Sequence, residues 1–184
     1  DSALVVHNPT VVGNQLNASI RAFDVAYENI TGRDDQIALI VYSNTSERPL
    51  YRTWNSTSKS LSDVKVINNT HINNTVRSAI GWIELVEMWN DAGDNEIALL
   101  MRHEADDDLS GIVWNATNST WGCNATLSYN LDVPGETKDF GGAYRKINKT
   151  LFVGISVTQA ANIRYANKTL NKCDWKVSGN IGST

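Results

Sequence analysis

Eleven Asn-x-Ser/Thr triplets, spread over the whole 184-residue sequence, constrain its fold most strongly. Each triplet is an acceptor for an N-linked glycan, and such a bulky, solubilising group must lie outside any packed core. The 21 asparagines and the 30 serines and threonines predict roughly three triplets by chance, so eleven is a clear excess. An accidental excess in an Asn- and Thr-rich chain is the alternative. We expect glycans at Asn17, Asn29, Asn44, Asn55, Asn68, Asn73, Asn115, Asn118, Asn124, Asn148 and Asn167.

Composition and charge predict a soluble protein of one domain. Hydrophobic residues make up 41% of the chain, which argues against disorder, and no linker-like stretch divides it. A net charge of −4, without a basic patch, argues against nucleic acid as a partner. No apolar run reaches the roughly 18 residues of a transmembrane helix. The sequence opens at Asp1 without signal-peptide features, so we expect that an export signal has been removed.

The two cysteines, Cys123 and Cys173, are predicted to form a disulfide. From Cys123 to Val133, apolar and polar residues alternate with the period of a half-buried strand, and the cysteine falls on the apolar side. Cys173, Trp175 and Val177 alternate with polar residues in the same way. Both thiols are therefore expected to point inward from strands, in the oxidising compartment that glycosylation implies. Two free buried thiols are the alternative.

Much of the remaining sequence predicts short β-strands. Apolar runs at 37–42 and 97–101 have the length of buried strands, and apolar residues alternate along 151–157. Polar, turn-forming segments separate these runs. Many strands at such short spacing predict a mainly β fold, an antiparallel β-sandwich that is immunoglobulin-like in architecture.

A further predicted strand contains Phe23, Val25 and Tyr27, which alternate with other residues and so share one face. Asn29 falls in the same phase. Because a glycosylated asparagine cannot face a core, this strand should end or bulge before Asn29.

Residues 76–91 are the exception to this strand pattern. Asn74 or Thr75 could cap the start of a helix here, and Gly93 could end it. We therefore predict one short helix at 76–91. The β-branched and aromatic content of the segment keeps a strand as the alternative. The apolar residues that recur at helical steps of three and four are Val76, Ala79, Ile80, Ile83 and Val86.

The N-terminal residues form an apolar arm. Ala3, Leu4, Val5 and Val6 place apolar side chains on both faces of an extended strand, so both faces need cover. One reading is a first strand within the chain's own sandwich. The other is a donor strand that completes the sheet of a neighbouring copy, which would build a homopolymer because the contact is heterologous. We predict a donor-strand arm at 1–13 and a glycosylated sandwich domain at 14–184.

No catalytic motif is found in the sequence. The three histidines are scattered, and the chain contains neither a zinc-protease motif, nor a nucleophile elbow, nor a phosphate-binding glycine loop. Asp24, Glu84 and Glu87 could in principle pair for glycoside hydrolysis, but scattered carboxylates of this kind usually face solvent. We therefore assign no catalytic residue and expect no enzyme activity.

One acidic cluster suggests calcium as a bound ion. Glu104, Asp106, Asp107 and Asp108 lie in a short loop before Gly111, and closely spaced carboxylates are typical Ca²⁺ ligands. Their spacing does not fit an EF-hand loop. A solvated acidic turn is the alternative, and apart from Ca²⁺ and N-linked glycans we expect no cofactor.

The sequons, the arm at Ala3 to Val6, the strand-rich body and the cysteine pair make this chain similar to subunits of archaeal extracellular thread-type pili. The resemblance is one of architecture over the whole chain and includes no diagnostic motif. It implies a heavily N-glycosylated β-sandwich whose N-terminal tail inserts into the next subunit by donor-strand complementation. The expected function is a structural subunit of a cell-surface filament for adhesion or cell-cell contact.

Two other functions stay open. A glycosylated cell-surface or viral ectodomain would bind a receptor through a face without glycans, and a secreted carbohydrate-active enzyme is the third candidate. A bare stripe among the glycans would favour the ectodomain, whereas glycans all round a fibre would favour the filament.

Overall fold

The computed structural model describes residues 23–30, 37–43, 49–68, 80–91, 93–103, 108–128, 131, 139–157 and 162–181. These residues form β-strands and their connections, with no helix among them, so the predicted mainly β fold is confirmed. The strands are β1 (Phe23–Tyr27), β2 (Ile37–Ser43), β3 (Pro49–Asn55), β4 (Ser60–Leu61), β5 (Lys65–Val66), β6 (Ile80–Trp89), β7 (Asn95–His103), β8 (Leu109–Asn115), β9 (Thr120–Ser128), β10 (Phe140–Arg145), β11 (Thr150–Val157), β12 (Asn162–Thr169) and β13 (Lys176–Ile181).

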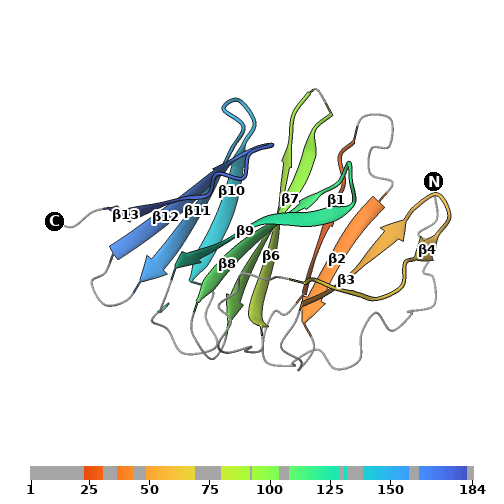
Figure 1. The fold of residues 1–184 in the computed structure, drawn as a ribbon, viewed down its shortest axis with the longest axis horizontal. Coiled ribbons are helices and arrows are strands. Elements are labelled where there is room, and N and C mark those ends of the chain that lie inside the picture. Colours follow the sequence, from red (N-terminus) through yellow and green to blue (C-terminus); the bar gives the residue numbers. More distant parts are fainter. Residues whose placement is uncertain are drawn as a thin grey trace, which may run out of the picture.

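The strands form three antiparallel sheets, and in each sheet consecutive strands pair as a meander. Sheet A has the order β1-β2-β3-β4, with β5 also paired to β3; sheet B has the order β6-β7-β8-β9; and sheet C has the order β10-β11-β12-β13. In Figure 1 they spread as a fan, with sheet A in orange and gold, sheet B in green and sheet C in blue. The sandwich therefore has three layers.

Sheet B is the middle layer, and its strand β7 is buried on both faces. Ile97, Leu99 and Met101 belong to a core shared with sheet A, whereas Ala98 and Leu100 belong to a second core shared with sheet C. Because side chains alternate between the two faces of a strand, one strand can serve both cores. This position explains why residues 97–101 are continuously apolar.

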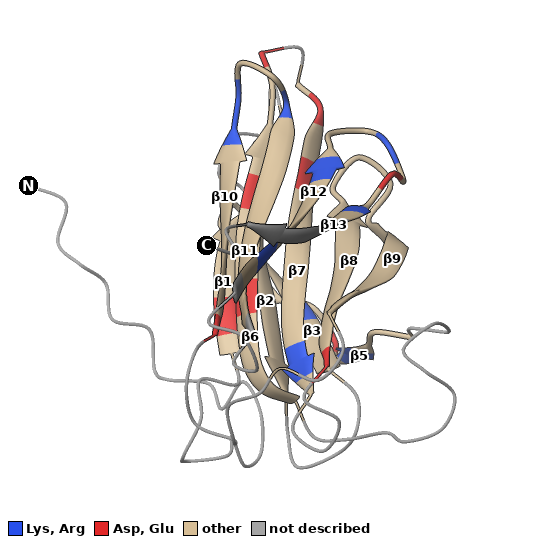
Figure 2. Ribbon diagram, turned by 90° about the vertical axis from the view of Figure 1, so that its left-hand side faces the viewer, with Lys and Arg blue, Asp and Glu red and all other residues tan. Residues whose placement is uncertain are grey.

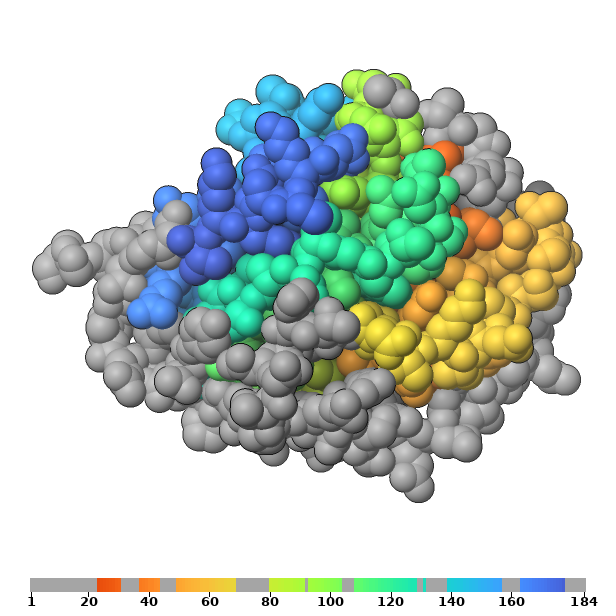
Figure 3. All heavy atoms as spheres, in the orientation of Figure 1, coloured from red at the N-terminus to blue at the C-terminus, as the bar shows by residue number. Residues whose placement is uncertain are grey.

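The first strands of the three sheets lie together, since β6 contacts both β1 and β10. Strands β1 and β6 run in the same direction: Asp24 bonds to Leu85, and farther along both strands Tyr27 bonds to Glu87. The sheets therefore radiate from a seam formed by their first strands. In the space-filling view their atoms lie side by side in the order A, B, C (Figure 3).

The prediction of a helix at 76–91 is wrong. Residues 80–89 form β6, and residues 76–79 lie outside the described part of the chain. The physical reason is that sheet B has a neighbouring sheet on each face, so apolar residues occur at both odd and even positions of β6 and imitate helical spacing. Gly93, expected to end the helix, instead adopts a φ of 84° in the β6–β7 turn, a conformation that suits glycine.

The predicted donor-strand arm at 1–13, including Ala3 to Val6, lies outside the described residues, and so does the boundary with the domain at 14–184. Both stay predictions. The expected end of a strand before Asn29 is confirmed, because β1 ends at Tyr27. Within the described residues there is no helix that could cross a membrane.

Candidate functional site: glycan acceptors and an open sheet face

The three sheets are structural repeats, as the contacts between their first strands show. Asp24 Oδ2 accepts a hydrogen bond from the N–H of Leu85 (2.8 Å), and Glu84 Oε1 accepts one from the N–H of Gly142 (3.4 Å). If Asp24, Glu84 and Gly141 are aligned as equivalent positions, both hydrogen bonds follow one rule. Each carboxylate accepts from the residue that directly follows the equivalent position on the next sheet. Sheet B is therefore placed relative to sheet A as sheet C is placed relative to sheet B.

Each sheet has an upstream face, which points toward the sheet before it in the chain, and a downstream face on the other side. The downstream face of A packs on the upstream face of B, and the downstream face of B packs on the upstream face of C. Within the described residues, no sheet covers the upstream face of A or the downstream face of C. The upstream residues of the first strands are Phe23, Val25 and Tyr27 in A, Ile83, Leu85 and Glu87 in B, and Phe140, Gly142 and Tyr144 in C.

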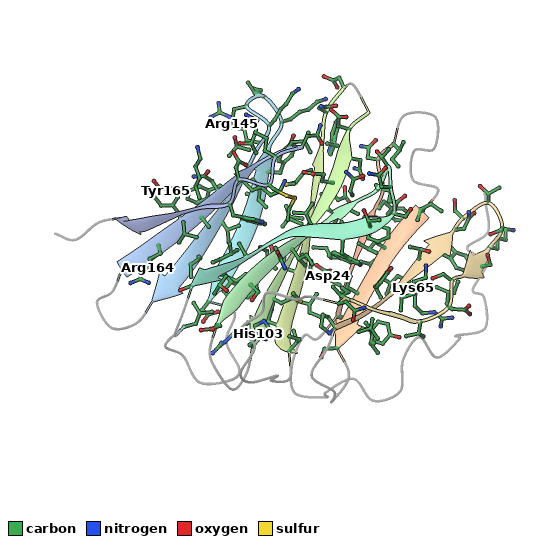
Figure 4. The ribbon with its side chains drawn as sticks, in the orientation of Figure 1. Asp24, Lys65, His103, Arg145, Arg164 and Tyr165 are labelled. Atoms are coloured by element: carbon green, nitrogen blue, oxygen red, sulfur yellow. A yellow bond between two sulfur atoms is a disulfide. The ribbon has the colours of Figure 1, made fainter. Side chains whose placement is uncertain are left out.

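All three sheets turn at a common end, which we call the hairpin end. Here the first strand of each sheet connects to the second, and the third connects to the fourth. The three first strands run in the same direction, because Glu84 bonds to Gly142 and, farther along, the Tyr144 hydroxyl donates to the carbonyl of Trp89 (2.8 Å). In Figure 4, Arg145 lies at this end and His103 at the opposite end.

The hairpin end collects most of the described glycan acceptors. Eight of the eleven sequon asparagines lie in the described part of the chain, and five of these are in or beside the turns of the hairpin end. Asn68 lies after β5 at the opposite end, and Asn124 and Asn167 lie within β9 and β12. Asn17, Asn44 and Asn73 fall outside the described residues. The five acceptors at the hairpin end are Asn29, Asn55, Asn115, Asn118 and Asn148.

Two of these asparagines build the turns that carry them. Asn55 Oδ1 accepts hydrogen bonds from the N–H groups of Thr57 and Ser58, both at 2.9 Å, and Asn115 Oδ1 accepts one from the N–H of Asn118 at 3.1 Å. Asparagine favours such turns because its side chain imitates the backbone. The oxygen therefore holds the turn, whereas a glycan is attached to the nitrogen. A glycan at Asn55 or Asn115 would leave these hydrogen bonds intact.

The β3–β4, β8–β9 and β10–β11 turns share one backbone design. Each has four turn residues, and the last of them has a positive φ: 53° at Lys59, 52° at Ser119 and 53° at Lys149. A serine or threonine follows each time, and Thr120 and Thr150 are the hydroxyl residues of the sequons at Asn118 and Asn148. Asn118 and Asn148 are exposed within these turns. The β8–β9 and β10–β11 turns thus present an acceptor to solvent, and in the β3–β4 hairpin the acceptor Asn55 lies directly before the turn.

The predicted disulfide between Cys123 and Cys173 is present and joins sheet B to sheet C, with a Cα–Cα distance of 4.9 Å (Figure 4). Its local geometry differs from the expectation, because Cys173 is exposed in the connection before β13 and does not point inward from a strand. Cys123 lies at a β-bulge, where Ile112 faces both Cys123 and Asn124, and it has a φ of 53°. The bulge redirects the Cys123 side chain toward sheet C.

Polar links connect the third strands to the preceding sheets. Trp114 Nε1 donates a hydrogen bond to Glu28 Oε1 (2.8 Å), and the fully buried Lys168 donates from Nζ to Glu96 Oε2 (2.7 Å). Trp114 and Lys168 occupy equivalent positions on the upstream faces of B and C. In both sheets, the side chain at this position of the third strand thus donates a hydrogen bond to a glutamate of the preceding sheet, which is consistent with the repeat.

The carboxylates considered for glycoside hydrolysis all lie at the seam between the first strands. Asp24 and Glu84 accept the hydrogen bonds described above, and Glu87 Oε1 accepts one from the N–H of Tyr27 (2.9 Å). Figure 4 labels Asp24 on β1. Their bonds to backbone N–H groups join neighbouring sheets, so their arrangement fits a structural role.

Of the three histidines and the acidic loop, the structure describes His103 and Asp108. His103 Nε2 lies 3.1 Å from Ser110 Oγ, but both side chains are buried and closed to a substrate. Asp106 and Asp107, the predicted calcium ligands, lie outside the described residues, whereas the carbonyl of Asp108 accepts the N–H of His103. The described residues contain no group of three potential metal ligands. Lys, Arg, Asp and Glu are dispersed over the described strands (Figure 2).

Compared with known proteins, the sequence matches no family model and no curated protein. The repeat was missed by sequence reasoning, although two short signals mark it. Trp-Asn-x-Thr occurs at 54–57 and 114–117, where the third strands of A and B end. Phe-x-x-Ala-Tyr occurs at 23–27 and 140–144, in the first strands of A and C. A search for weak internal repeats would have found both.

Proposed function

We propose that this protein is a glycosylated structural subunit of an extracellular assembly. The observation that carries the proposal is the position of the sequons: turns of one design recur on all three sheets, with exposed acceptors within them at Asn118 and Asn148 and an acceptor directly before the turn at Asn55. The disulfide between sheets B and C is consistent with an oxidising compartment. Asp24, Glu84 and Glu87 bond to backbone N–H groups, and His103 is buried beside Ser110, which supports a non-enzymatic role.

The proposed assembly is a filament in which each copy donates its N-terminal arm to the next. The arm contains an apolar run at Ala3 to Val6, and an extended strand of this kind pairs with an exposed sheet edge. The outermost strands of the sheets, such as β4 and β13, are the edges that a donated strand could extend.

Glycan occupancy tests the glycoprotein assignment. Intact mass measurement of secreted protein, before and after enzymatic deglycosylation, should show at least eight occupied sequons. Peptide mapping should place Asn55, Asn115, Asn118 and Asn148 among them. Three or fewer occupied sites would contradict the proposal.

Removal of the arm tests strand donation. A chain that lacks residues 1–13 should form no fibres in negative-stain electron microscopy, and the free peptide of residues 1–13 should raise its thermal stability in trans. A peptide of the same composition in scrambled order is the control. If the shortened chain still polymerises, or ignores the native peptide, the arm is not a donor strand.

A receptor-binding ectodomain is the second candidate, and the uneven sequon distribution favours it. Among the described residues, five acceptors gather at the hairpin end, so the outer faces of sheets A and C carry few of them. A secreted monomer with a bare flank would fit this candidate. Fibres formed by the purified protein would count against it.

A further inference from the structure

We infer that the upstream face of sheet A binds the downstream face of sheet C from a second copy of this chain, so that two copies close a ring of six sheets. The contact continues the packing already present within one chain. It is separate from the strand donation proposed above, because it uses the faces of the outer sheets.

The first observation is an exposed apolar row on β1. Phe23, Val25 and Tyr27 are 49%, 48% and 42% exposed, although they alternate along the strand as core residues do. At the equivalent position of Phe23, Ile83 of sheet B is 0% exposed and Phe140 of sheet C is 5% exposed. The preceding sheet covers both of these residues, so the row on β1 is the surface that a preceding sheet would cover.

The second observation is that the downstream face of sheet C carries the matching position of the repeat. Phe152 is 43% exposed on this face and stacks on Tyr165 at a centroid distance of 5.4 Å. The equivalents of Phe152 in the other two sheets are Leu39 and Ala98, both 0% exposed beneath the next sheet. Among the described residues, apolar side chains are therefore exposed on both outer faces, in β1 of sheet A and in β11 of sheet C, whereas Ala38 and Tyr42 beside the β1 row are each 3% exposed.

The third observation concerns closure. The same relation carries A to B and B to C, and a contact between unlike faces either closes a ring or extends without limit. Radial arrays of four-stranded sheets close with about four to eight sheets, so the three described sheets are too few to close, and two copies of them supply a number within this range. A second copy presents both required faces, and the two contacts of the ring are then identical.

One sequon adds a testable requirement to the ring. Asn167 lies on the downstream face of sheet C, at the position that Thr53 occupies in sheet A and Val113 in sheet B. Val113 is 2% exposed beneath sheet C, so a glycan at this position would block a covering sheet. The ring therefore requires that Asn167 is unmodified, although acceptors in the hairpin turns can carry glycans.

The test measures mass and glycan occupancy on the secreted, glycosylated chain. Native mass spectrometry and light scattering across a dilution series should show a unit of twice the subunit mass, either free or joined to further units through the donated arms, and peptide mapping should show Asn167 without glycan. Val25→Lys, in the middle of the exposed row, should raise the dissociation constant at least about 30-fold, as loss of an interface hot spot does. Ile147→Lys is the matched control, since Ile147 is 87% exposed in the β10–β11 turn, and it should leave the constant unchanged.

Several results would overturn the ring: a monomer at every concentration, an open polymer that Val25→Lys disperses into monomers, an occupied Asn167 in the dimer, or a Val25→Lys chain that pairs like the wild type. Circular dichroism of Val25→Lys would confirm that the variant folds. A glycosylated monomer would defeat the ring and leave the glycoprotein assignment standing. An unglycosylated dimer would support the ring and contradict the glycoprotein assignment.

Discussion

At the scale of single residues, small side chains decide how closely the sheets and their connections pack. A Cβ atom added at Gly111 would lie 2.9 Å from Cζ2 of Trp175 and 3.1 Å from Cδ1 of Leu127. Trp175 is held there by a hydrogen bond from its Nε1 to the carbonyl of Cys123 (2.6 Å). Gly111 thus provides the space in which the connection before β13 docks on sheet B.

Gly111→Ala should therefore destabilise the protein by about 1 to 3 kcal/mol, the usual cost of an extra methyl group in a packed site. Gly122→Ala is the control, because a Cβ there meets nothing within 4 Å, and its effect should stay within about 0.5 kcal/mol. Urea unfolding of both variants measures the difference. Equal stability of the two variants would show that Trp175 does not pack on Gly111 in solution.

At the scale of elements, strand edges and connections join the sheets. Carboxylates of β1 and β6 accept backbone N–H groups across the seam, and the buried Lys168–Glu96 pair fastens β12 to β7. Glu96 also accepts the N–H of Asn171 (3.0 Å), so one carboxylate positions both β12 and the turn that follows it. The Cys123–Cys173 disulfide then closes the other side of the B–C contact.

Replacing both cysteines by serine should lower the free energy of unfolding by about 4 kcal/mol, because the bond spans 50 residues and limits the unfolded chain. Thermal or urea unfolding with and without a reducing agent is the measurement. Reductant should destabilise the wild type by a similar amount and leave the double serine variant unchanged. A wild type that ignores reductant would contradict this role for the disulfide.

At the scale of the whole molecule, the two cores set the response to pH. Burial raises the pKa of Tyr51, which packs against Trp114 and Trp121 in the core between A and B. Burial also raises the pKa of Tyr144 in the core between B and C, and the nearby charge of Glu96 adds to this effect. Both tyrosines are thus expected to stay protonated at a pH where the unfolded chain loses protons.

The protein should therefore lose stability in alkali. Below about pH 10, tyrosine is protonated in both the folded and the unfolded state, so these groups contribute no pH dependence. Above it, the unfolded chain releases protons first, and the free energy of unfolding falls as the pH rises through the raised folded pKa values. Urea unfolding between pH 7 and pH 11 tests this. The free energy of unfolding of Tyr51→Phe should fall less steeply with pH than that of the wild type above pH 10, and the two curves should run parallel below pH 9.

The sequence alone determined the strand-rich class, the cysteine pairing and the end of β1 before Asn29. These features follow from local alternation, from the small number of cysteines and from the rule that a glycan acceptor cannot face a core. The sequence also marked Phe23, Val25 and Tyr27 as one apolar row, although these three side chains are exposed. An apolar row is a local property, whereas its cover depends on what packs against it.

Only the tertiary structure decided the order of the layers, and with it the conformation of residues 80–89. Between two sheets a strand is apolar on both faces, and it then loses the period of two that distinguishes it from a helix. The bulge at Cys123, the seam carboxylates and the gathering of acceptors at the hairpin end likewise depend on contacts between residues far apart in the sequence. Local patterns carry no record of such contacts, because several packings satisfy the same alternation.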